Sequence, residues 1–180
     1  MKLIVGLGNC SEEYDTTRHN IGFKAVDYLH EFSGVFEPWT DNKKMLCYGF
    51  SIGEIFNKKC VLVKPNTYMN LSGNCVIKIM NYYKISSNDL IVIHDDADFD
   101  FGIIKTSQSR NAAGHNGVKS INSVVIGDYT RIRVGIGRPD ENKFDIANYV
   151  LSKFTTSERR EMDNIFANVA KLVEDIVKNN

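Results

Sequence analysis

The sequence has little proline, no net charge and no long apolar run. Only 3 of the 180 residues are proline, and lysine plus arginine equal aspartate plus glutamate at 22 each. Scarce proline without a low-complexity tract argues against a long linker or disordered tail. Zero net charge argues against broad nonspecific binding of nucleic acid. No run approaches the roughly 18 apolar residues of a membrane span, and the apolar start is too short for a signal peptide. We therefore expect one globular domain over residues 1–180, without membrane attachment.

The four cysteines do not form the pattern of a metal or redox site. No two of them have the C-x-x-C spacing that a zinc site or a redox motif uses. Without a secretory signal, they are expected to be free thiols in a reducing compartment, which for this chain is the cytoplasm. They are Cys10, Cys47, Cys60 and Cys75.

Apolar spacing predicts strands that alternate with helices. Short apolar or alternating runs indicate strands at 2–6, 45–56, 60–64, 90–93 and 132–136, with another beginning at 103–104. Helical spacing indicates helices at 20–33, 71–84, 114–124 and over the last 25 residues. This order predicts an α/β fold with a twisted, mixed and mostly parallel sheet and helices on both faces.

The C-terminal helix is amphipathic, and its apolar stripe is expected to join the core. Thr155 and Glu158 offer a capping box at its start.

The charges are unevenly distributed along the chain. Residues 89–100 contain five aspartates and no lysine or arginine, whereas residues 102–143 contain seven lysines and arginines against three acidic residues. This asymmetry fits either chance variation on a solvated surface or an anion site beside an acidic or catalytic rim.

Short polar boxes carry the chemistry. His19 lies in Thr-Arg-His-Asn-Ile-Gly, and three asparagines, Asn9, Asn70 and Asn116, lie in boxes with glycine. Asp95 lies just after the predicted strand at 90–93. The carboxyl ends of strands are where α/β folds gather their functional groups. A histidine paired with a carboxylate can take a proton from water. Asparagine amides can hold a carbonyl or a water, so the boxes suit hydrolysis of a neutral polar substrate. No serine or cysteine stands out as a nucleophile.

In their order and in their residues, these boxes resemble the motifs of the bacterial-type peptidyl-tRNA hydrolases. Six segments carry the resemblance along nearly the whole chain, at 3–9, 17–22, 65–73, 94–98, 114–117 and 131–139. The resemblance implies a cytosolic, usually monomeric enzyme without an obligate protein partner. It implies hydrolysis of the ester between a peptide and the 3′-terminal ribose of tRNA, in the recycling of peptidyl-tRNA released during translation. No metal or organic cofactor is implied.

The resemblance also implies roles for particular residues. His19 would be the general base and Asp95 would orient it. Asn9 and Asn116 would position the carbonyl and the water, and Asn70 would bind the peptide backbone. It implies that Tyr14 and Met69 line the site and that Lys105 with Arg133 holds the tRNA 5′-phosphate. From their places in the boxes, we add Tyr68 beside Met69 as a contact, and His115 beside Asn116 as a contact or as a group that supports one.

The chain departs from the family pattern in a few places, none of which removes an implied catalytic group. Cys10 stands where the family usually has proline, which puts a thiol near the site. Asp96 and Ala97 replace a common glutamate and leucine. Residues 109–110, Ser-Arg, stand where two glycines are usual, which adds a cation to that loop.

Other interpretations remain open from the sequence. Gly6-x-Gly8 after a strand is typical of dinucleotide binding, but Ser11 occupies the third glycine position. The aspartates at 95–100 with the histidines could hold a metal. An RNA-binding protein without catalysis is a third class, although such a relative would be expected to lose His19 or Asp95. Asn20 is interpreted as a helix cap, whereas Asn70 is assigned to function.

Overall fold

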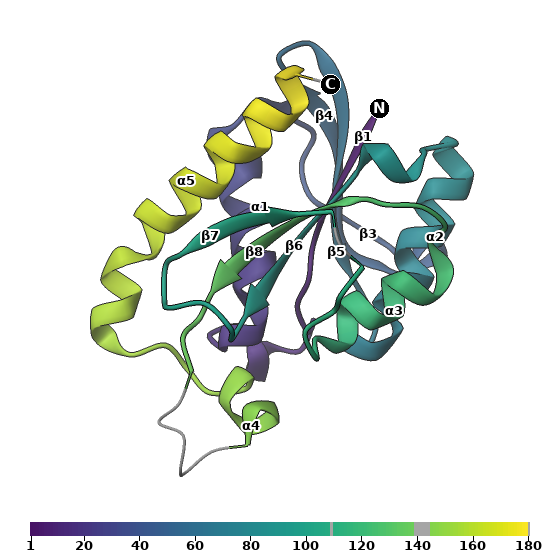
Figure 1. Ribbon diagram of the computed structural model, residues 1–180. Helices are drawn as coiled ribbons and strands as arrows, with labels where there is room; N and C mark the ends of the chain where they lie inside the picture. Colours follow the sequence, from purple (N-terminus) through teal and green to yellow (C-terminus); the bar gives the residue numbers. More distant parts are fainter. Residues whose placement is uncertain (109, 139–144, 180) are drawn as a thin grey trace.

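One eight-stranded sheet organises the chain, which a computed structural model describes over residues 1–108, 110–138 and 145–179 (Figure 1). Its strands are β1 (Lys2–Gly6), β2 (Val35–Phe36), β3 (Thr40–Asn42), β4 (Cys47–Ile55), β5 (Lys58–Pro65), β6 (Leu90–Asp96), β7 (Ile104–Ser107) and β8 (Thr130–Gly135). The helices are α1 (Ile21–Phe32), α2 (Ser72–Tyr83), α3 (Asn116–Val124), α4 (Ile146–Val150) and α5 (Thr156–Asn179). Short 3-10 turns include Arg18–Asn20 and Met69–Leu71.

The sheet is mixed, with parallel strands at its centre. The strand order is β2-β4-β5-β1-β6-β8-β7, with β3 paired to β4. β1 runs parallel to β5 and β6, and β6 runs parallel to β8. The pairs β4–β5 and β7–β8 are antiparallel, so the antiparallel pairs lie toward the two edges. The predicted α/β class and mixed sheet are confirmed, and β4 and β5 form a hairpin.

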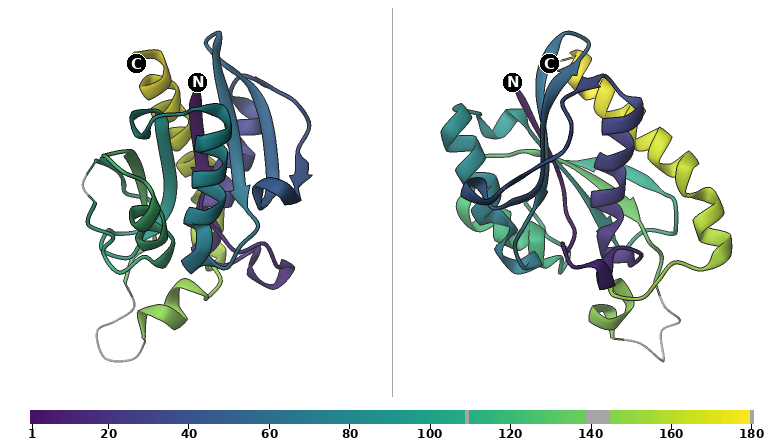
Figure 2. Two further views of the ribbon diagram at one scale, coloured as in Figure 1. Left: turned by 90° about the vertical axis from the view of Figure 1, so that its right-hand side faces the viewer. Right: turned by 180° about the vertical axis from the view of Figure 1, so that it is seen from behind.

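Helices cover both faces of this sheet. Figure 2 shows α1 and α5 on one face, and α2 and α3 pack together on the other. β1 is buried on both sides: Ile4 joins the cluster with α1 and α5, whereas Leu3 and Val5 join the cluster with α2 and α3. This double burial explains the continuous apolar run at 2–6, because an interior parallel strand has no solvated face.

The start of α5 is fixed by the capping box that the sequence predicts. The backbone N–H of Thr155 donates to the Glu158 carboxylate at 2.7 Å, and the Glu158 N–H donates to Thr155 Oγ1 at 3.3 Å. The same carboxylate accepts hydrogen bonds from the two terminal guanidinium nitrogens of Arg18, at 2.8 and 2.9 Å. The apolar stripe of α5 is buried, as expected, and includes Ile165, Phe166, Val169 and Val173. One carboxylate therefore ties α5 to the turn that carries His19.

Some elements differ from the sequence expectations. β2, β3 and α4 were not predicted; they have two, three and five residues, too few for a periodic pattern to show. The polar residues Arg131 and Arg133, which alternate with apolar residues in β8, do not form a solvated face. Arg131 is only 1% exposed, and its Nη2 donates to Ser107 Oγ at 3.4 Å and to the Asn111 carbonyl oxygen at 2.9 Å.

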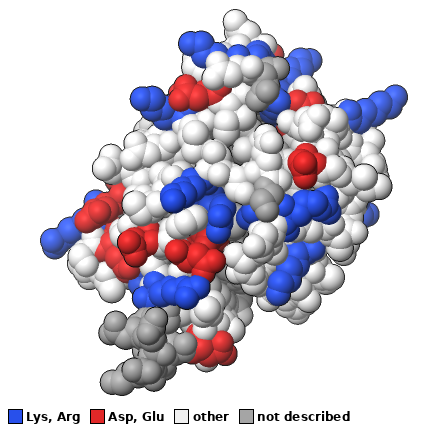
Figure 3. All heavy atoms as spheres, viewed as in Figure 1, with Lys and Arg blue, Asp and Glu red and all other residues white. Residues whose placement is uncertain are grey.

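The aspartate-rich run is largely neutralised by folding. Asp89 pairs with Lys2, Asp96 with Arg133 and Asp98 with Arg138. Figure 3 accordingly shows acidic and basic atoms lying beside one another on this face. Of the charged residues counted over 102–143, Asp140, Glu141 and Lys143 lie outside the described residues. No helix in the described ranges is both long and apolar enough to cross a bilayer.

Gly22 allows α1 to approach the ends of β1 and β6 closely. A Cβ at this position would lie 2.4 Å from the Ile93 carbonyl oxygen and 2.5 Å from the Leu7 nitrogen. Both contacts are with backbone of buried strands or their ends, so neither can move aside cheaply. The close approach brings His19, three residues before Gly22, against the end of β6.

Gly22→Ala is therefore expected to destabilise the protein by about 2 kcal/mol or more through overpacking. Helix propensity alone predicts the opposite sign, since alanine is favoured over glycine by about 1 kcal/mol. Urea unfolding of this variant, with Asn164→Ala on the exposed side of α5 as control, measures the difference. A Gly22→Ala variant as stable as the wild type would contradict the close approach.

Candidate active site

The polar boxes meet at one edge of the sheet, where the parallel strands end. Asn9 follows β1, the Asn66–Asn70 segment follows β5, and Asp95 is the penultimate residue of β6. His19 reaches the same edge from the 3-10 turn before α1. The chain termini lie at the opposite edge (Figure 1). Boxes that are far apart in the sequence therefore lie together in space.

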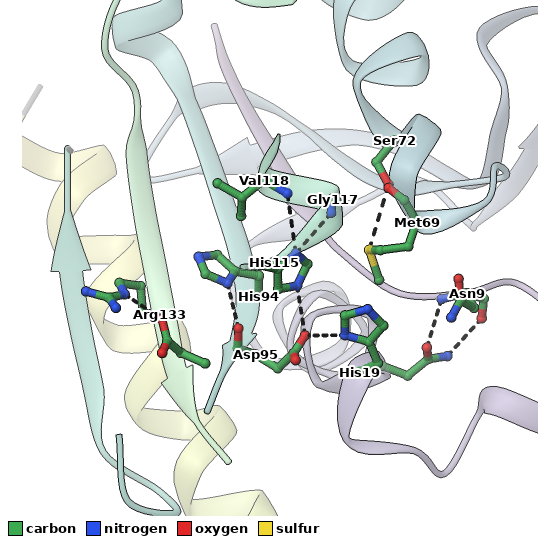
Figure 4. A network of polar contacts seen from close by, with 12 residues as sticks. Asn9, His19, Met69, Ser72, His94, Asp95, His115, Gly117, Val118 and Arg133 are labelled. Carbon is green, nitrogen blue, oxygen red and sulfur yellow. Dashed lines mark hydrogen bonds and ion pairs between the residues drawn. The ribbon is translucent and has the colours of Figure 1, made fainter. Parts of the chain in front are cut away.

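The buried carboxylate of Asp95 is the centre of this arrangement (Figure 4). Its Oδ1 lies 2.8 Å from His19 Nδ1 and 2.9 Å from His115 Nε2. Asp95 is only 2% exposed. Burial favours the neutral acid, but the two imidazoles outweigh burial and hold the pKa of Asp95 well below its usual range. Asp95 is thus a carboxylate that accepts from two rings.

This contact fixes the tautomer of His19. An ionised carboxylate can only accept, so the proton of neutral His19 must lie on Nδ1. The lone pair then lies on Nε2, and the ring borders both cavities described below. Burial lowers the pKa of His19, but the Asp95 charge and hydrogen bond reverse this effect and raise the pKa above 6.5. His19 is therefore placed to accept a proton from a group in the cavity.

The tautomer of His115 is fixed as well. Its Nδ1 accepts backbone N–H groups from Gly117 at 3.1 Å and Val118 at 3.3 Å, which caps α3. An accepting Nδ1 leaves the proton of the neutral ring on Nε2, which faces Asp95. The helix cap thus sets the direction of the hydrogen bond to the carboxylate.

A third histidine, His94, supports Asp95 from behind. His94 Nδ1 lies 2.7 Å from the Asp95 carbonyl oxygen, and His94 Nε2 lies 3.2 Å from Arg131 Nη1. Full burial, together with the neighbouring His115 and Arg131, lowers the pKa of His94 well below its ordinary value. A neutral ring that donates through Nδ1 and accepts through Nε2 satisfies both contacts. From the sequence, His94 was considered only as a possible metal ligand, and Arg131 only as one of the cations at 102–143.

Asn20 does not cap α1, contrary to the sequence interpretation. Its side-chain oxygen accepts the Asn9 backbone N–H at 2.8 Å, and its side-chain nitrogen donates to the Asn9 carbonyl at 2.9 Å. No hydrogen bond runs from the Asn20 side chain to the described first turn of α1. The Asn20 amide makes two hydrogen bonds to Asn9 in place of a cap on α1, because these bonds satisfy both the N–H and the carbonyl group of the Asn9 backbone. Asn20 therefore holds Asn9 in place.

The larger cavity beside His19 has a volume of about 930 Å³ and a neutral lining. No Lys, Arg, Asp or Glu among the described residues borders it. Seven of the predicted site residues line it: Asn9, Tyr14, His19, Tyr68, Met69, Asn70 and Asn116. Amide groups beside apolar walls suit a neutral, peptide-like group better than a charged small molecule.

A smaller cavity of about 310 Å³ adjoins the first. It is bordered by Asp95 and His115, and it shares His19 and Asn116 with the larger one. Asn116, the first residue of α3, thus lies between the two spaces. α4 closes one side of both through Ala147 and Val150.

Lys105 and Arg133 are brought together, but outside these cavities. They face each other across β7 and β8, and both cations lie over the Phe99 ring, at 4.7 and 4.5 Å from its centroid. Arg133 also pairs with Asp96 at 2.6 Å, whereas Lys105 is exposed. The carboxylate beside Arg133 was not foreseen from the sequence and reduces its free charge.

The departures from the family pattern leave the cluster around Asp95 intact. The Cys10 thiol, which lines the larger cavity, donates to Asn66 Oδ1 at 2.9 Å. Arg110 donates to the carbonyls of Asn122, Val125 and Gly127 at the end of α3. Ser109 and the segment 139–144, which includes the last residue of the matched stretch 131–139, lie outside the described residues. All four cysteines are free, as expected.

A metal could in principle be sought among His19, Asp95 and His115, whose ligand atoms lie within 4.8 Å of one another. The two nitrogens that face Asp95 carry protons in the tautomers deduced above, so they present N–H groups and not lone pairs to the centre. The donor set as folded therefore fits a hydrogen-bonded cluster better than a metal site.

Several cavity residues had no signal in the sequence. Leu46 lines the larger cavity from the residue before β4, Asn74 from α2 and Val150 from α4. Thr67 lines it too, and its Oγ1 is the buried side-chain polar atom within the described residues that has no hydrogen-bond partner. Thr67 lies inside the matched segment 65–73, which is the one signal that pointed toward it.

Comparison with known proteins places these features in a family. The model of the family described as peptidyl-tRNA hydrolase matches residues 3–180. A peptidyl-tRNA hydrolase of Wolbachia sp. subsp. Drosophila simulans (strain wRi) is 45% identical over 179 residues, covering 99% of this chain and 91% of the relative. One from Clostridium botulinum (strain Hall) is 44% identical over the same coverage.

A solved structure agrees with the sequence relatives. The crystal structure of peptidyl-tRNA hydrolase from Acinetobacter baumannii superposes with a TM-score of 0.91 at 32% identity, covering 99% of this chain and 89% of that one. The family match extends over both sides of the cavity and all the strands that position it. The chain therefore belongs to the peptidyl-tRNA hydrolase family, whose members cleave the ester bond between peptide and tRNA.

Proposed function

We propose that this protein hydrolyses peptidyl-tRNA by using His19 as the general base. The observation that carries the proposal is the 2.8 Å contact between His19 Nδ1 and the buried Asp95 carboxylate, which directs the Nε2 lone pair away from Asp95. His19 Nε2 takes a proton from water as the water oxygen attacks the ester carbonyl carbon. The tetrahedral intermediate then collapses, and the imidazolium returns the proton to the departing 3′-oxygen of the ribose.

The neutral cavity supplies the substrate contacts in this proposal. Asn9 and Asn116 hold the carbonyl and the attacking water, with Asn116 donating to the developing oxyanion. Asn70 binds the peptide backbone, and Tyr14, Tyr68 and Met69 enclose the peptide. Support comes from the joint presence of these side chains in the wall of one cavity with His19, and from Asn20, which fixes the Asn9 backbone.

The tRNA 5′-phosphate is assigned to Lys105 and Arg133. Their cross-strand pairing over Phe99 gives two adjacent cations on one surface. Because Asp96 already occupies Arg133 Nε, the phosphate would use the terminal nitrogens of Arg133 and the exposed Lys105. Residues 1–180 would act as one catalytic domain, as a cytoplasmic monomer that binds the acceptor end of peptidyl-tRNA and recycles the tRNA.

His19→Ala should lower turnover of N-acetyl-aminoacyl-tRNA by at least about 100-fold, because general base catalysis typically contributes that much. Binding of the tRNA should persist, since the proposed phosphate contacts are remote from the ring. The assay is release of the blocked amino acid, run with and without a chelator. Substantial turnover by His19→Ala would assign the base to another group, and loss of wild-type turnover with the chelator would assign the reaction to a metal.

The pH profile of kcat/KM tests the state of His19. The base must be neutral, so activity should fall as pH drops through its raised pKa, with a midpoint above 6.5. Asp95→Asn removes the charge that raises this pKa and can impose the wrong tautomer, so the rate should drop by about 100-fold or more and the midpoint should move to lower pH. An unaltered profile in Asp95→Asn would remove Asp95 from the mechanism.

Lys105→Ala and Arg133→Ala should raise KM for full-length tRNA several-fold, because each removes a charge-assisted contact to phosphate. A short acylated 3′ fragment lacks the 5′-phosphate, and its KM should stay the same in both variants. Lys171→Ala on α5 removes an equal charge elsewhere and serves as control. Equal losses on the two substrates would show that these cations act on the fold or the chemistry and not on the phosphate.

A further inference from the structure

We propose that His115 limits the basicity of His19 by sharing with it one oxygen of Asp95. The inference rests on the proposed function in one respect: His19 is taken to be the base. It deepens that function by giving His115 the role of a positioning and tuning residue, which acts through Asp95. The sequence had left two roles open for His115, a contact with the substrate or a group that supports its neighbour Asn116.

The sharing is visible in the geometry. His19 Nδ1 and His115 Nε2 approach the same atom, Asp95 Oδ1, at 2.8 and 2.9 Å. The two rings lie 4.9 Å apart between centroids. Figure 4 shows both contacts converging on this one oxygen. An N–H from His115 withdraws electron density from the oxygen that must stabilise protonated His19, and it brings a positive edge close to that imidazolium.

His115 cannot easily leave this position. Its Nδ1 is held by the N–H groups of Gly117 and Val118, so the ring is clamped between the start of α3 and the carboxylate. On its other side it meets His94 edge-on, at 4.8 Å between ring centroids. The donor to Asp95 is therefore built into the N-terminus of α3 and does not depend on a mobile side chain.

Other charges around the pair are already balanced or held back. Asp96 pairs with Arg133, and Arg18 pairs with Glu158. Arg131 contacts His94, whose other ring nitrogen contacts the Asp95 carbonyl oxygen and not its carboxylate. Within the described residues, the titratable groups that line the larger cavity with His19 are Cys10, Tyr14 and Tyr68, and those that line the smaller one with it are Asp95, Asp96 and His115. His115 is thus the group that competes directly with His19 for Asp95 Oδ1.

This competition suits a base that must also act as an acid. After attack, protonated His19 has to give its proton to the departing ribose oxygen. A His19 paired with an unshared carboxylate would hold that proton more strongly and return it more slowly. Sharing the oxygen keeps the pKa of the His19 imidazole closer to the working pH, so that the ring can both take the proton from water and return it to the ribose oxygen.

Two substitutions separate the shared contact from the helix cap. The side-chain oxygen of Asn is at the same bond position as Nδ1 of His, so His115→Asn keeps the cap for α3 but cannot reach Asp95. His115→Phe keeps the ring volume but loses both the cap and the donor. The change common to both variants is the loss of the hydrogen bond to Asp95.

In both variants the acid limb of the kcat/KM profile should move to higher pH, by about half a unit to one unit, as expected for loss of an ordinary hydrogen bond. ¹⁵N NMR titration of the His19 ring should show the same shift without any substrate. His30→Asn, at a histidine that contacts Glu37 and Trp39 outside the site, is the matched control and should leave both midpoints in place. Midpoints of His19 that stay in place or fall in both His115 variants would overturn the proposal.

The NMR titration separates this inference from the proposed function. A raised His19 midpoint by NMR with an unmoved rate profile would retain the shared oxygen but refute His19 as the base. If the variants do not fold, the wild type still gives a test, because its neutral His115 must carry the proton on Nε2. An NMR spectrum that places the proton on Nδ1 of His115 would reject the shared contact.

Discussion

A single buried carboxylate oxygen, Asp95 Oδ1, organises the functional edge of this protein. An uncompensated buried charge is costly, and a carboxylate at this depth persists only when hydrogen bonds replace its water. The two imidazole N–H groups supply that replacement at 2.8 and 2.9 Å. In return, the ionised oxygen determines which nitrogen of each ring carries the proton. The fold satisfies one buried charge and, by the same contacts, directs the lone pair of His19.

The rest of the structure brings the donors to that oxygen. The parallel centre of the sheet places the ends of β1, β5 and β6 at one edge. The close approach at Gly22 seats the turn carrying His19 against β6, and Arg18 anchors this turn to the cap of α5. His115 arrives at the start of α3. The larger cavity and the cationic pair are separate: the wall of that cavity is neutral over its described residues, whereas Lys105 and Arg133 lie over the Phe99 ring.

The long, periodic elements and the meeting of His19 with Asp95 were predictable from the sequence. Apolar periodicity marks β1, β6, α1 and α5, because their burial is deep and regular. His19 and Asp95 were paired through their boxes and the strand-end rule. The contacts of Asn20 with Asn9 and of Arg131 with His94 were not predictable, since each joins residues whose spacing depends on the finished fold. β2, β3 and α4 are too short to show a periodic pattern of apolar residues. Asn20 was predicted to cap α1, but its side chain bonds to the Asn9 backbone instead.

The central claim is that water is activated at His19 Nε2, inside the neutral cavity. A crystal structure with an amide-linked analogue, in which an acylamino group replaces the 3′ ester of a terminal adenosine, tests it most directly. The account predicts the acyl group among Asn9, Asn70 and Asn116, with a water about 3 Å from His19 Nε2 and in line with the carbonyl carbon. A carbonyl bound away from His19, or one beside a group other than His19 that holds the water, would contradict it.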